Sequence, residues 1–174
     1  MTDLNIRKLS TVDIDALQQL SRQTFFEAFY DLNTEENMTS YLRDAFSTEK
    51  LSAELSNASS QFFFAEIYGR PIGYLKLNTG SAQTDLKEDK GLEIERIYVL
   101  AAFQGKKIGQ LFCDHALEIA VQGKYDYIWL GVWEENQKAI KFYKKNGFVQ
   151  FGKHIFQLGD DEQTDIMMKL SLIQ

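Results

Sequence analysis

Apolar and polar residues alternate with period two over residues 4–9, which predicts a short strand near the start of the chain. The spacing then becomes helical, with an apolar stripe that consists of Ile14, Leu17, Leu20, Thr24 and Phe25. Ser10 and Asp13 precede the stripe and resemble an N-cap region. The pattern therefore predicts a strand followed by an amphipathic helix.

Two shorter helices are predicted next. Thr34 is positioned to cap the first, and Ser47 or Thr48 the second. Their apolar positions are Met38, Tyr41, Leu42, Ala45, Leu51 and Leu55. Their acidic positions, which we expect to face solvent, are Glu35, Glu36, Asp44, Glu49 and Glu54.

A β-hairpin is predicted from residues 61–67 and 72–78, which flank the turn Tyr68-Gly69-Arg70-Pro71. The polar run 79–90 that follows is expected to be a solvent loop. Two closing strands are expected at residues 148–151 and 165–170. His154 lies in the connection between them and is expected to be a surface or packing residue.

Residues 92–145 form the most informative stretch, which predicts strand, turn, helix, strand and helix in that order. The first helix has the apolar stripe Ile108, Leu111, Phe112, Ala116 and Ile119. A strand that runs through a Gly/Lys turn directly into a helix aims several backbone N–H groups and the positive helix end at one point. Such a point favours phosphate.

The second helix of this stretch follows the strand 127–133. Asn136, Ala139, Ile140 and Tyr143 are spaced i, i+3, i+4 and i+7, so that an amide and a phenol share one face about 10.5 Å apart along the axis. That face could line a long, narrow ligand. Together the elements predict one α+β domain over residues 1–174, with a mixed, mostly antiparallel sheet of seven strands and flanking helices.

Composition narrows the possible functions. The net charge of −6 disfavours general nucleic-acid binding and is compatible with a cationic small substrate. One cysteine excludes an internal disulfide framework, and with two histidines it makes a structural zinc site improbable. Cys113 is expected to be a core residue. No leader-like or 18-residue apolar stretch is present, so we expect a cytoplasmic protein without a membrane partner or a metal.

Two segments resemble the GNAT superfamily of N-acetyltransferases. QGKKIG (104–109) is similar to its acetyl-CoA pyrophosphate signature, and NQKAIKFYKKNGF (136–148) to its second element, in the same order and separation. ERIYV, WLGVWEEN, FYKKNGF, TFFEAF and GDDEQTD further resemble the PaiA-type polyamine acetyltransferases, and the likeness covers nearly the whole chain. It implies the GNAT acyltransferase fold, in which strands 93–99 and 127–133 run parallel and splay apart to make a slot for acetyl-CoA.

The phosphate turn departs from the family pattern, because Lys107 stands where the family has its central glycine, and Gly105 lies two residues earlier. A positive φ at Lys107 would cost about 1 kcal/mol or more. The N–H groups of Ile108, Gly109 and Gln110 would remain free donors at the helix start. The resemblance implies these cofactor-binding residues: Ile97, Tyr98, Val99, Gln104, Gly105, Lys106, Lys107, Ile108, Gly109, Gln110, Asn136 and Tyr143.

Acetyl transfer to an amine needs a neutral nucleophile, and an aliphatic amine of pKa about 10.4 is neutral only about once in 2,500 molecules at pH 7. Glu93 and Glu95 are candidate bases, since carboxylates at i and i+2 of a regular strand point to one face, shared here with Ile97 and Val99. By the resemblance Glu93 matches the position of a general base in some members. Alternatively, either glutamate pairs with Arg96 or a lysine, or the base acts through ordered water.

The departing thiolate needs a proton, and the carbonyl oxygen needs hydrogen-bond donors. Tyr143 matches the family's general acid, and Asn136 would hold the cofactor arm. Backbone N–H groups near Val99 and Leu100 could serve the oxyanion. Glu27 and Tyr30 are substrate candidates from the resemblance; the alternative is that they pack the first helix against the core.

The expected activity is therefore direct acetyl transfer from acetyl-CoA to a primary amine, with a polyamine such as spermidine or spermine favoured by the PaiA-like segments. The expected partners are acetyl-CoA and a cationic small-molecule amine, and a homodimer stays open. Alternatives are an acetyltransferase acting on a protein N-terminus or an aminoglycoside, and a non-catalytic module that binds CoA. The least supported alternative is a nucleotide-binding enzyme, because the sequence contains neither G-x-x-x-x-G-K-S/T nor G-x-G-x-x-G.

Overall fold

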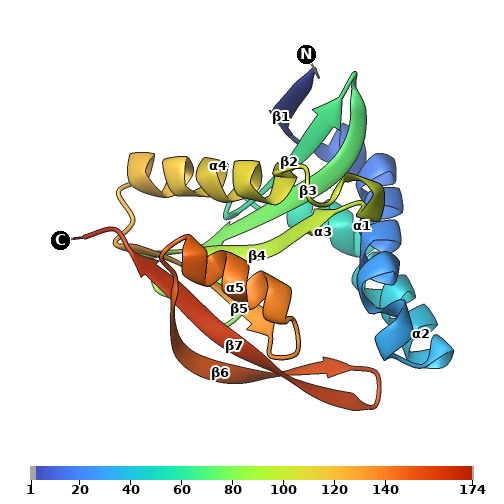
Figure 1. The fold of residues 1–174 in the computed structure, drawn as a ribbon. Coiled ribbons are helices and arrows are strands. Elements are labelled where there is room, and N and C mark those ends of the chain that lie inside the picture. The colour runs from blue at the N-terminus through green and yellow to red at the C-terminus, as the bar shows by residue number, and fades with distance from the viewer. Residues whose placement is uncertain (1–2, 174) are drawn as a thin grey trace.

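The computed structural model describes residues 3–173, and Figure 1 shows a twisted sheet with helices on both faces. The strands are β1 (Leu4–Lys8), β2 (Ser60–Ile67), β3 (Arg70–Thr79), β4 (Gly91–Val99), β5 (Tyr127–Trp133), β6 (Val149–Leu158) and β7 (Asp161–Ser171). Their order in the sheet is β1-β2-β3-β4-β5-β7-β6, and all neighbours are antiparallel except β4 and β5. The predicted seven-stranded α+β fold is confirmed.

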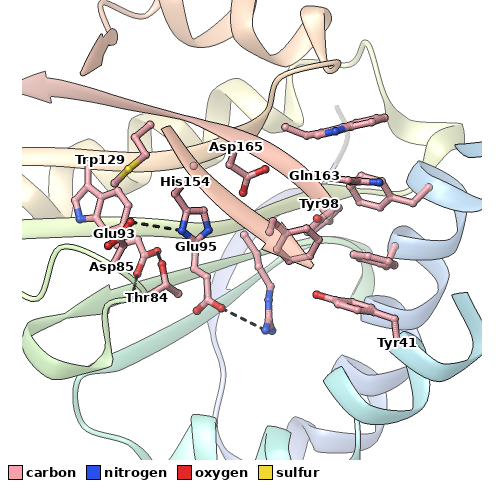
Figure 2. Close-up of a pocket in the computed structure, with 17 residues that line it drawn as sticks. Tyr41, Thr84, Asp85, Glu93, Glu95, Tyr98, Trp129, His154, Gln163 and Asp165 are labelled. Carbon is pink, nitrogen blue, oxygen red and sulfur yellow. Dashed lines mark hydrogen bonds and ion pairs between the residues drawn. The ribbon is translucent and has the colours of Figure 1, made fainter. Parts of the chain in front are cut away.

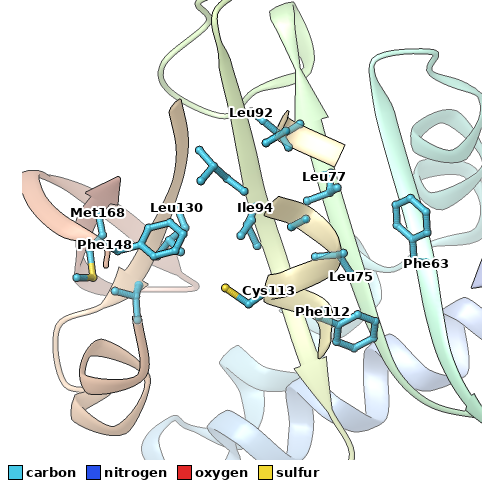
Figure 3. Packing of buried hydrophobic residues seen from close by; sticks show 14 of the residues in the cluster. Phe63, Leu75, Leu77, Leu92, Ile94, Phe112, Cys113, Leu130, Phe148 and Met168 are labelled. Atoms are coloured by element: carbon cyan, nitrogen blue, oxygen red, sulfur yellow. The ribbon is translucent and has the colours of Figure 1, made fainter. Parts of the chain in front are cut away.

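Within residues 3–173, five α-helices cover the sheet, and each face has its own apolar cluster. The helices are α1 (Ile14–Phe29), α2 (Glu35–Ala45), α3 (Thr48–Ser56), α4 (Ile108–Gln122) and α5 (Gln137–Lys145). On the α4 and α5 face, the buried cluster includes Phe112, Ile94 and Leu130 (Figure 3). On the face of α1, α2 and α3, Leu17 packs with Phe64. Both faces are therefore closed by a buried core.

The parallel strands β4 and β5 separate at their carboxyl ends. They pair only over residues 91–94 and 127–130. Beyond Ile94, β4 continues beside β3, and β5 continues beside β7. The two strands therefore form a wedge in the middle of the sheet, as the resemblance implied (Figure 1).

A β-bulge in β4 changes which side chains share a face. Glu95 is the inserted residue where the pairing with β3 shifts register. Side chains alternate between the two faces of a sheet, and at a bulge this alternation shifts by one residue. Ile97 and Val99 consequently pack into the cluster under α4, whereas Glu93 and Glu95 line a cavity on the opposite face. The prediction that all four share one face was wrong, because it assumed a regular strand.

The two closing strands are longer than the predicted segments 148–151 and 165–170. They form one hairpin that turns at Gly159 and Asp160. The missed part of β6 alternates partly buried and exposed positions and contains many polar residues, since β6 is an edge strand of the sheet. His154 therefore belongs to a strand and not to a loop. Across residues 3–173, every helix falls short of the length and apolarity that a bilayer span requires.

Candidate active site

The turn before α4 has the strained backbone that its sequence implied. Gly105 has φ +77° and Lys107 has φ +65°, so the lysine occupies the left-handed region. The first helical bond of α4 runs from the Leu111 N–H to the Lys107 carbonyl at 3.0 Å. The N–H groups of residues 108–110 precede that bond, so they have no acceptor within the helix and point out of its N-terminal end. Lys106 adds a cation, which lies 5.0 Å from the centre of the Phe103 ring.

The wedge leads into a groove of about 500 Å³, which we call the α5 groove. Its walls include Ile97, Val99, Gln104, Asn136, Ala139 and Tyr143. The groove thus brings together residues of β4, the following turn and α5, as the site prediction required. Its length suits an extended ligand with polar groups along one side.

The free edge of β4 supplies main-chain donors to this groove. The Leu100 N–H donates to the Ile72 carbonyl at 3.0 Å, so it is already occupied by β3. Since N–H directions alternate along an antiparallel strand, those of Ile97 and Val99 point away from β3 and into the wedge. The expectation that Leu100 donates to an oxyanion is therefore wrong, and Val99 is the better placed of the two. The Val99 carbonyl accepts from Gln104 Nε2 at 3.2 Å.

Tyr143 lies on the α5 wall of the groove. Its ring centre is 5.7 Å from that of Phe148, and its side chain packs against the core under α4. Burial raises the pKa of Tyr143 well above its usual value, with a smaller contribution from Cys113. The phenol therefore stays protonated at neutral pH and can donate a proton. Cys113 is itself buried, which raises its pKa to about 11 and fits its predicted core role.

Asn136 begins α5 and also lines the groove. Its Oδ1 accepts from the Ala139 N–H at 3.1 Å, in the geometry of a helix cap. This bond fixes the side chain and leaves its NH₂ group to donate elsewhere. The arrangement explains why an asparagine precedes this helix and why its amide faces the groove.

On the opposite face of the sheet lies a second cavity, of about 270 Å³, which we call the β7 cavity (Figure 2). Its aromatic wall consists of Phe25, Phe29, Tyr41, Tyr98, Trp129, Trp133 and Phe156. Its acidic residues are Asp85, Glu93, Glu95 and Asp165. Such a surface suits an organic cation, since aromatic faces and carboxylates both attract positive charge. The side chain of Tyr98 faces this cavity and stacks on Tyr74.

Glu93 is the more deeply buried of the two candidate bases, with 2% of its surface exposed. Its carboxylate accepts from Asn78 Nδ2 at 3.0 Å, from the Thr84 N–H at 2.9 Å and from the Thr84 hydroxyl. Burial nevertheless raises the pKa of Glu93 above its usual value, because these hydrogen bonds only partly offset the loss of water. A carboxylate with a raised pKa is a better proton acceptor near neutral pH.

Glu95 differs, because cations surround it. Lys76 Nζ lies 2.5 Å from its Oε2, and an Arg96 nitrogen lies 3.4 Å from its Oε1. Burial opposes ionisation of Glu95, but Arg96 and Lys76 outweigh it and lower the pKa. Glu54 of α3 joins the same group, 3.3 Å from Lys76. The expectation that Glu54 faces solvent was wrong, since these buried cations attract it inward.

The segment 79–90 is a largely exposed loop, as its polar composition predicted, but its middle contacts the sheet. Gln83 is 1% exposed and accepts from Trp129 Nε1 at 2.7 Å. Thr84 binds Glu93, and Asp85 lies 3.5 Å from His154 Nδ1. Thr84 and Asp85 thereby form part of the wall of the β7 cavity, because Glu93 and His154 provide partners for their side chains.

The two substrate candidates at the end of α1, Glu27 and Tyr30, lie in different places. Glu27 lines the α5 groove, and its carboxylate accepts from the Ala101 N–H at 2.8 Å, which ties α1 to the end of β4. Tyr30 is 45% exposed, and its ring lies tilted against that of Phe26, outside the walls of both cavities. The structure thus places Glu27 at the groove and Tyr30 on the surface.

Several cavity residues escaped the sequence reasoning: Thr84, Asp85, Trp129, His154, Gln163 and Asp165. Gln163 and Asp165 lie in the GDDEQTD segment, which signalled only the family resemblance. For Trp129 the available signal was alternation along β5, where Trp129, Gly131 and Trp133 share the face opposite to the apolar residues between them. Among residues 3–173, no group of three or more His, Cys, Asp or Glu could hold a metal ion.

The two cavities meet at the wedge. Both are lined by Phe29, Glu95, Arg96, Tyr98, Gly131 and Trp133. A ligand in the α5 groove and another in the β7 cavity can therefore approach each other through the sheet. This arrangement is suited to transfer of a group between two substrates.

Comparisons with known proteins agree with this geometry. Residues 16–148 match the Acetyltransferase (GNAT) family. The chain is 37% identical to an uncharacterized N-acetyltransferase in the pepI 3′ region of Lactobacillus delbrueckii subsp. lactis, over 99% of this chain and 100% of that one. It is 28% identical to a spermidine N(1)-acetyltransferase of Thermoplasma acidophilum, over 95% and 96% of the two chains.

Among solved structures, a PaiA N-acetyltransferase from Thermoplasma acidophilum in complex with coenzyme A superposes with a TM-score of 0.80. The two chains are 26% identical, and the match covers 97% of this chain and 99% of the other. Sequence, fold and wedge thus point to one conclusion. The chain belongs to the acetyltransferase (GNAT) family and is an acetyl-CoA-dependent N-acetyltransferase.

Proposed function

We propose that this N-acetyltransferase transfers acetyl from acetyl-CoA directly to a primary amine of a polyamine, such as spermidine or spermine, in a ternary complex. The observation that carries the proposal is the meeting of the α5 groove and the β7 cavity at the wedge. Because each substrate has its own cavity, both can be bound when the acetyl group moves.

The α5 groove and the turn before α4 together have the features that acetyl-CoA requires. The N–H groups at residues 108–110, with Lys106 and Lys107, provide positive charge for the pyrophosphate. Gln104, Asn136 and the free edge of β4 provide hydrogen bonds along the pantetheine arm, in the manner of an added strand. The Val99 N–H would then face the thioester carbonyl oxygen.

The candidate base and acid lie on the sides where each is needed. Glu93 faces the β7 cavity, so we assign it to accept a proton from the acceptor ammonium group, directly or through water. The neutral nitrogen then bonds to the acetyl carbon as the carbon–sulfur bond breaks, and the nitrogen loses its remaining extra proton to water to give the amide. Tyr143 faces the α5 groove, where its phenol would donate a proton to the departing sulfur.

The chemistry of the β7 cavity supports a polyamine acceptor. Its aromatic rings can cover methylene groups and ammonium groups, and its carboxylates can bind positive charge. The relative from Thermoplasma acidophilum that is named a spermidine N(1)-acetyltransferase supports the same substrate class. Glu27 holds the end of β4 in place, and we propose no direct role for Tyr30.

A panel of acceptors tests the proposal. The protein is mixed with acetyl-CoA and with spermidine, spermine, an aminoglycoside or a peptide with a free N-terminus, and thiol release is followed together with the mass of the product. We expect monoacetylated polyamine and the highest kcat/KM with spermidine or spermine. Preference for the peptide or the aminoglycoside would contradict the polyamine assignment. Binding of acetyl-CoA in a thermal-shift assay without turnover of any acceptor would contradict catalysis altogether.

A further inference from the structure

Within residues 3–173, every acidic residue of the β7 cavity but one has a hydrogen-bond donor or a basic side chain close to its carboxylate. Glu93 has Asn78 and Thr84 as donors, Glu95 has Lys76 and Arg96, and Asp85 has His154. No donor or cation within residues 3–173 lies within bonding distance of the Asp165 side chain. In Figure 2 its carboxylate accordingly carries no dashed line. Asp165 is therefore the carboxylate that an incoming cation can satisfy.

The position of Asp165 connects it with the reaction site. A Cβ atom built on Gly131 would lie 3.4 Å from Asp165 Oδ2, so the carboxylate sits directly over this glycine. Gly131 lines both cavities at the wedge. The absence of a side chain at residue 131 leaves the Asp165 carboxylate open toward the place where the two substrates meet.

The Asp165 side chain is half-buried. Burial raises the pKa of its carboxyl, and His154 of β6 partly offsets this rise. The other charged groups around the cavity are Asp85 on the segment 79–90 and Glu93, Glu95 and Arg96 on β4. A poorly hydrated carboxylate gains more from a bound cation than an exposed one does, because less water has to be displaced.

A second acceptor lies in the same wall. Gln163 is 8% exposed and lines the cavity. Its Nε2 donates to Asp161 at 2.8 Å and to Asn33 at 3.4 Å, which fixes the amide. Its Oε1 receives no hydrogen bond from any residue that the structure describes. An ammonium group has three donors and could use both oxygens.

We propose that Asp165 holds a second ammonium group of the acceptor, so that the enzyme selects amines that carry two positive charges. The inference rests on the proposed amine acetylation and adds the residue that chooses among amines. Tyr98 and Trp133 would flank the methylene chain between the two nitrogens. Asp165 is a specificity residue and takes no part in proton transfer.

The test compares α,ω-diamines of three to eight carbons with monoamines of equal length. For the wild type we expect kcat/KM to favour the diamine and to peak at one chain length, because the anchor is fixed. Asp165→Asn should lower kcat/KM for the best diamine about 10- to 100-fold, the range of one charge-assisted hydrogen bond, and change that for the monoamine less than about 3-fold. Asp160→Asn makes the same chemical change in the exposed β6–β7 turn and should leave both values unchanged.

The outcomes separate the two proposals. Wild-type enzyme that acetylates diamines and monoamines equally well would overturn the subsite alone, and this measurement does not depend on the folding of any variant. A preference for diamines without an optimum length, unchanged in Asp165→Asn, would show general attraction by net charge and would also overturn the subsite. Absence of turnover with every amine would overturn the proposed function together with it.

Discussion

Two glutamates of one strand have opposite acidities because their neighbours differ. Glu93 and Glu95 share a face and both accept from Asn78, yet the pKa of Glu93 is raised and that of Glu95 is lowered. Burial dominates for Glu93, whereas Arg96 and Lys76 outweigh burial for Glu95. A carboxylate held by two cations is a weak base, so the structure favours Glu93 for proton transfer.

Replacement of the proposed base should change the pH profile. A base works only when ionised, so kcat at saturating polyamine should fall as the pH falls through the pKa of Glu93, which lies above the usual value of 4.5. Glu93→Gln should remove this acid limb and lower kcat about 10²- to 10⁴-fold. Glu118→Gln, on the exposed side of α4, should leave the profile unchanged. An intact acid limb in Glu93→Gln would refute the assignment.

Removal of the Tyr143 hydroxyl should affect chemistry more than binding. Because burial keeps the phenol protonated at neutral pH, it can supply the proton that the thiolate needs. Tyr143→Phe should lower kcat about 10²-fold or more, with KM for acetyl-CoA changed little, in steady-state assays of thiol release. Tyr68→Phe alters an exposed turn residue and should have no effect. An unchanged kcat in Tyr143→Phe would assign the proton to another donor.

At the scale of elements, helix α4 has a lysine in the left-handed conformation at each end. Lys107 has φ +65° before its first turn, and Lys124 has φ +57° after its last. Either residue costs about 1 kcal/mol relative to glycine. Only Lys107 lies at the phosphate turn, where its positive charge can bind phosphate and so offset the cost of the strained backbone.

The two lysines form a matched pair for mutation. Lys107→Gly and Lys124→Gly should each stabilise the fold by about 1 kcal/mol, or raise Tm by about 2–4 °C, in thermal unfolding. Lys107→Gly should also raise KM for acetyl-CoA several-fold, whereas Lys124→Gly should leave it unchanged. If both variants changed KM for acetyl-CoA equally, Lys107 would have no specific role in cofactor binding.

Regular elements could be predicted from the sequence, whereas irregular ones could not. The stripe around Phe112 and the Asn136–Tyr143 spacing led to α4 and α5, because periodicity reports burial directly. The bulge at Glu95 leaves no periodic signal, so the faces of Ile97 and Val99 were misassigned. The contribution of Thr84 and Asp85 to the cavity wall was missed for a related reason: their partners Glu93 and His154 lie on other elements, so the loop itself has no periodic signal.

At the scale of the whole molecule, a buried ionic group links three elements. Lys76 on β3 lies between Glu54 on α3 and Glu95 on β4, and Arg96 contacts both carboxylates. Its members are largely shielded from water, so each charge depends on the others. The group fixes α3 against the sheet next to the wedge.

Loss of the central cation should unfold the protein more easily. Lys76→Met leaves two buried carboxylates with Arg96 alone and should cost about 3–5 kcal/mol in urea denaturation at pH 7. Because the pKa of Glu95 is lowered, this stabilisation is present above the usual value of 4.5 and is lost as the pH falls through the folded value. Lys90→Met breaks an exposed pair with Asp126 and should cost less than about 1 kcal/mol. Similar losses in both variants would contradict the role of burial.

The wedge also constrains the order of events in each catalytic cycle. The α5 groove extends from α5 through the wedge to α1, and the β7 cavity adjoins it there, so the two ligands can be bound at the same time. The opening between β4 and β5 therefore joins the two cavities, and only the acetyl group has to cross it.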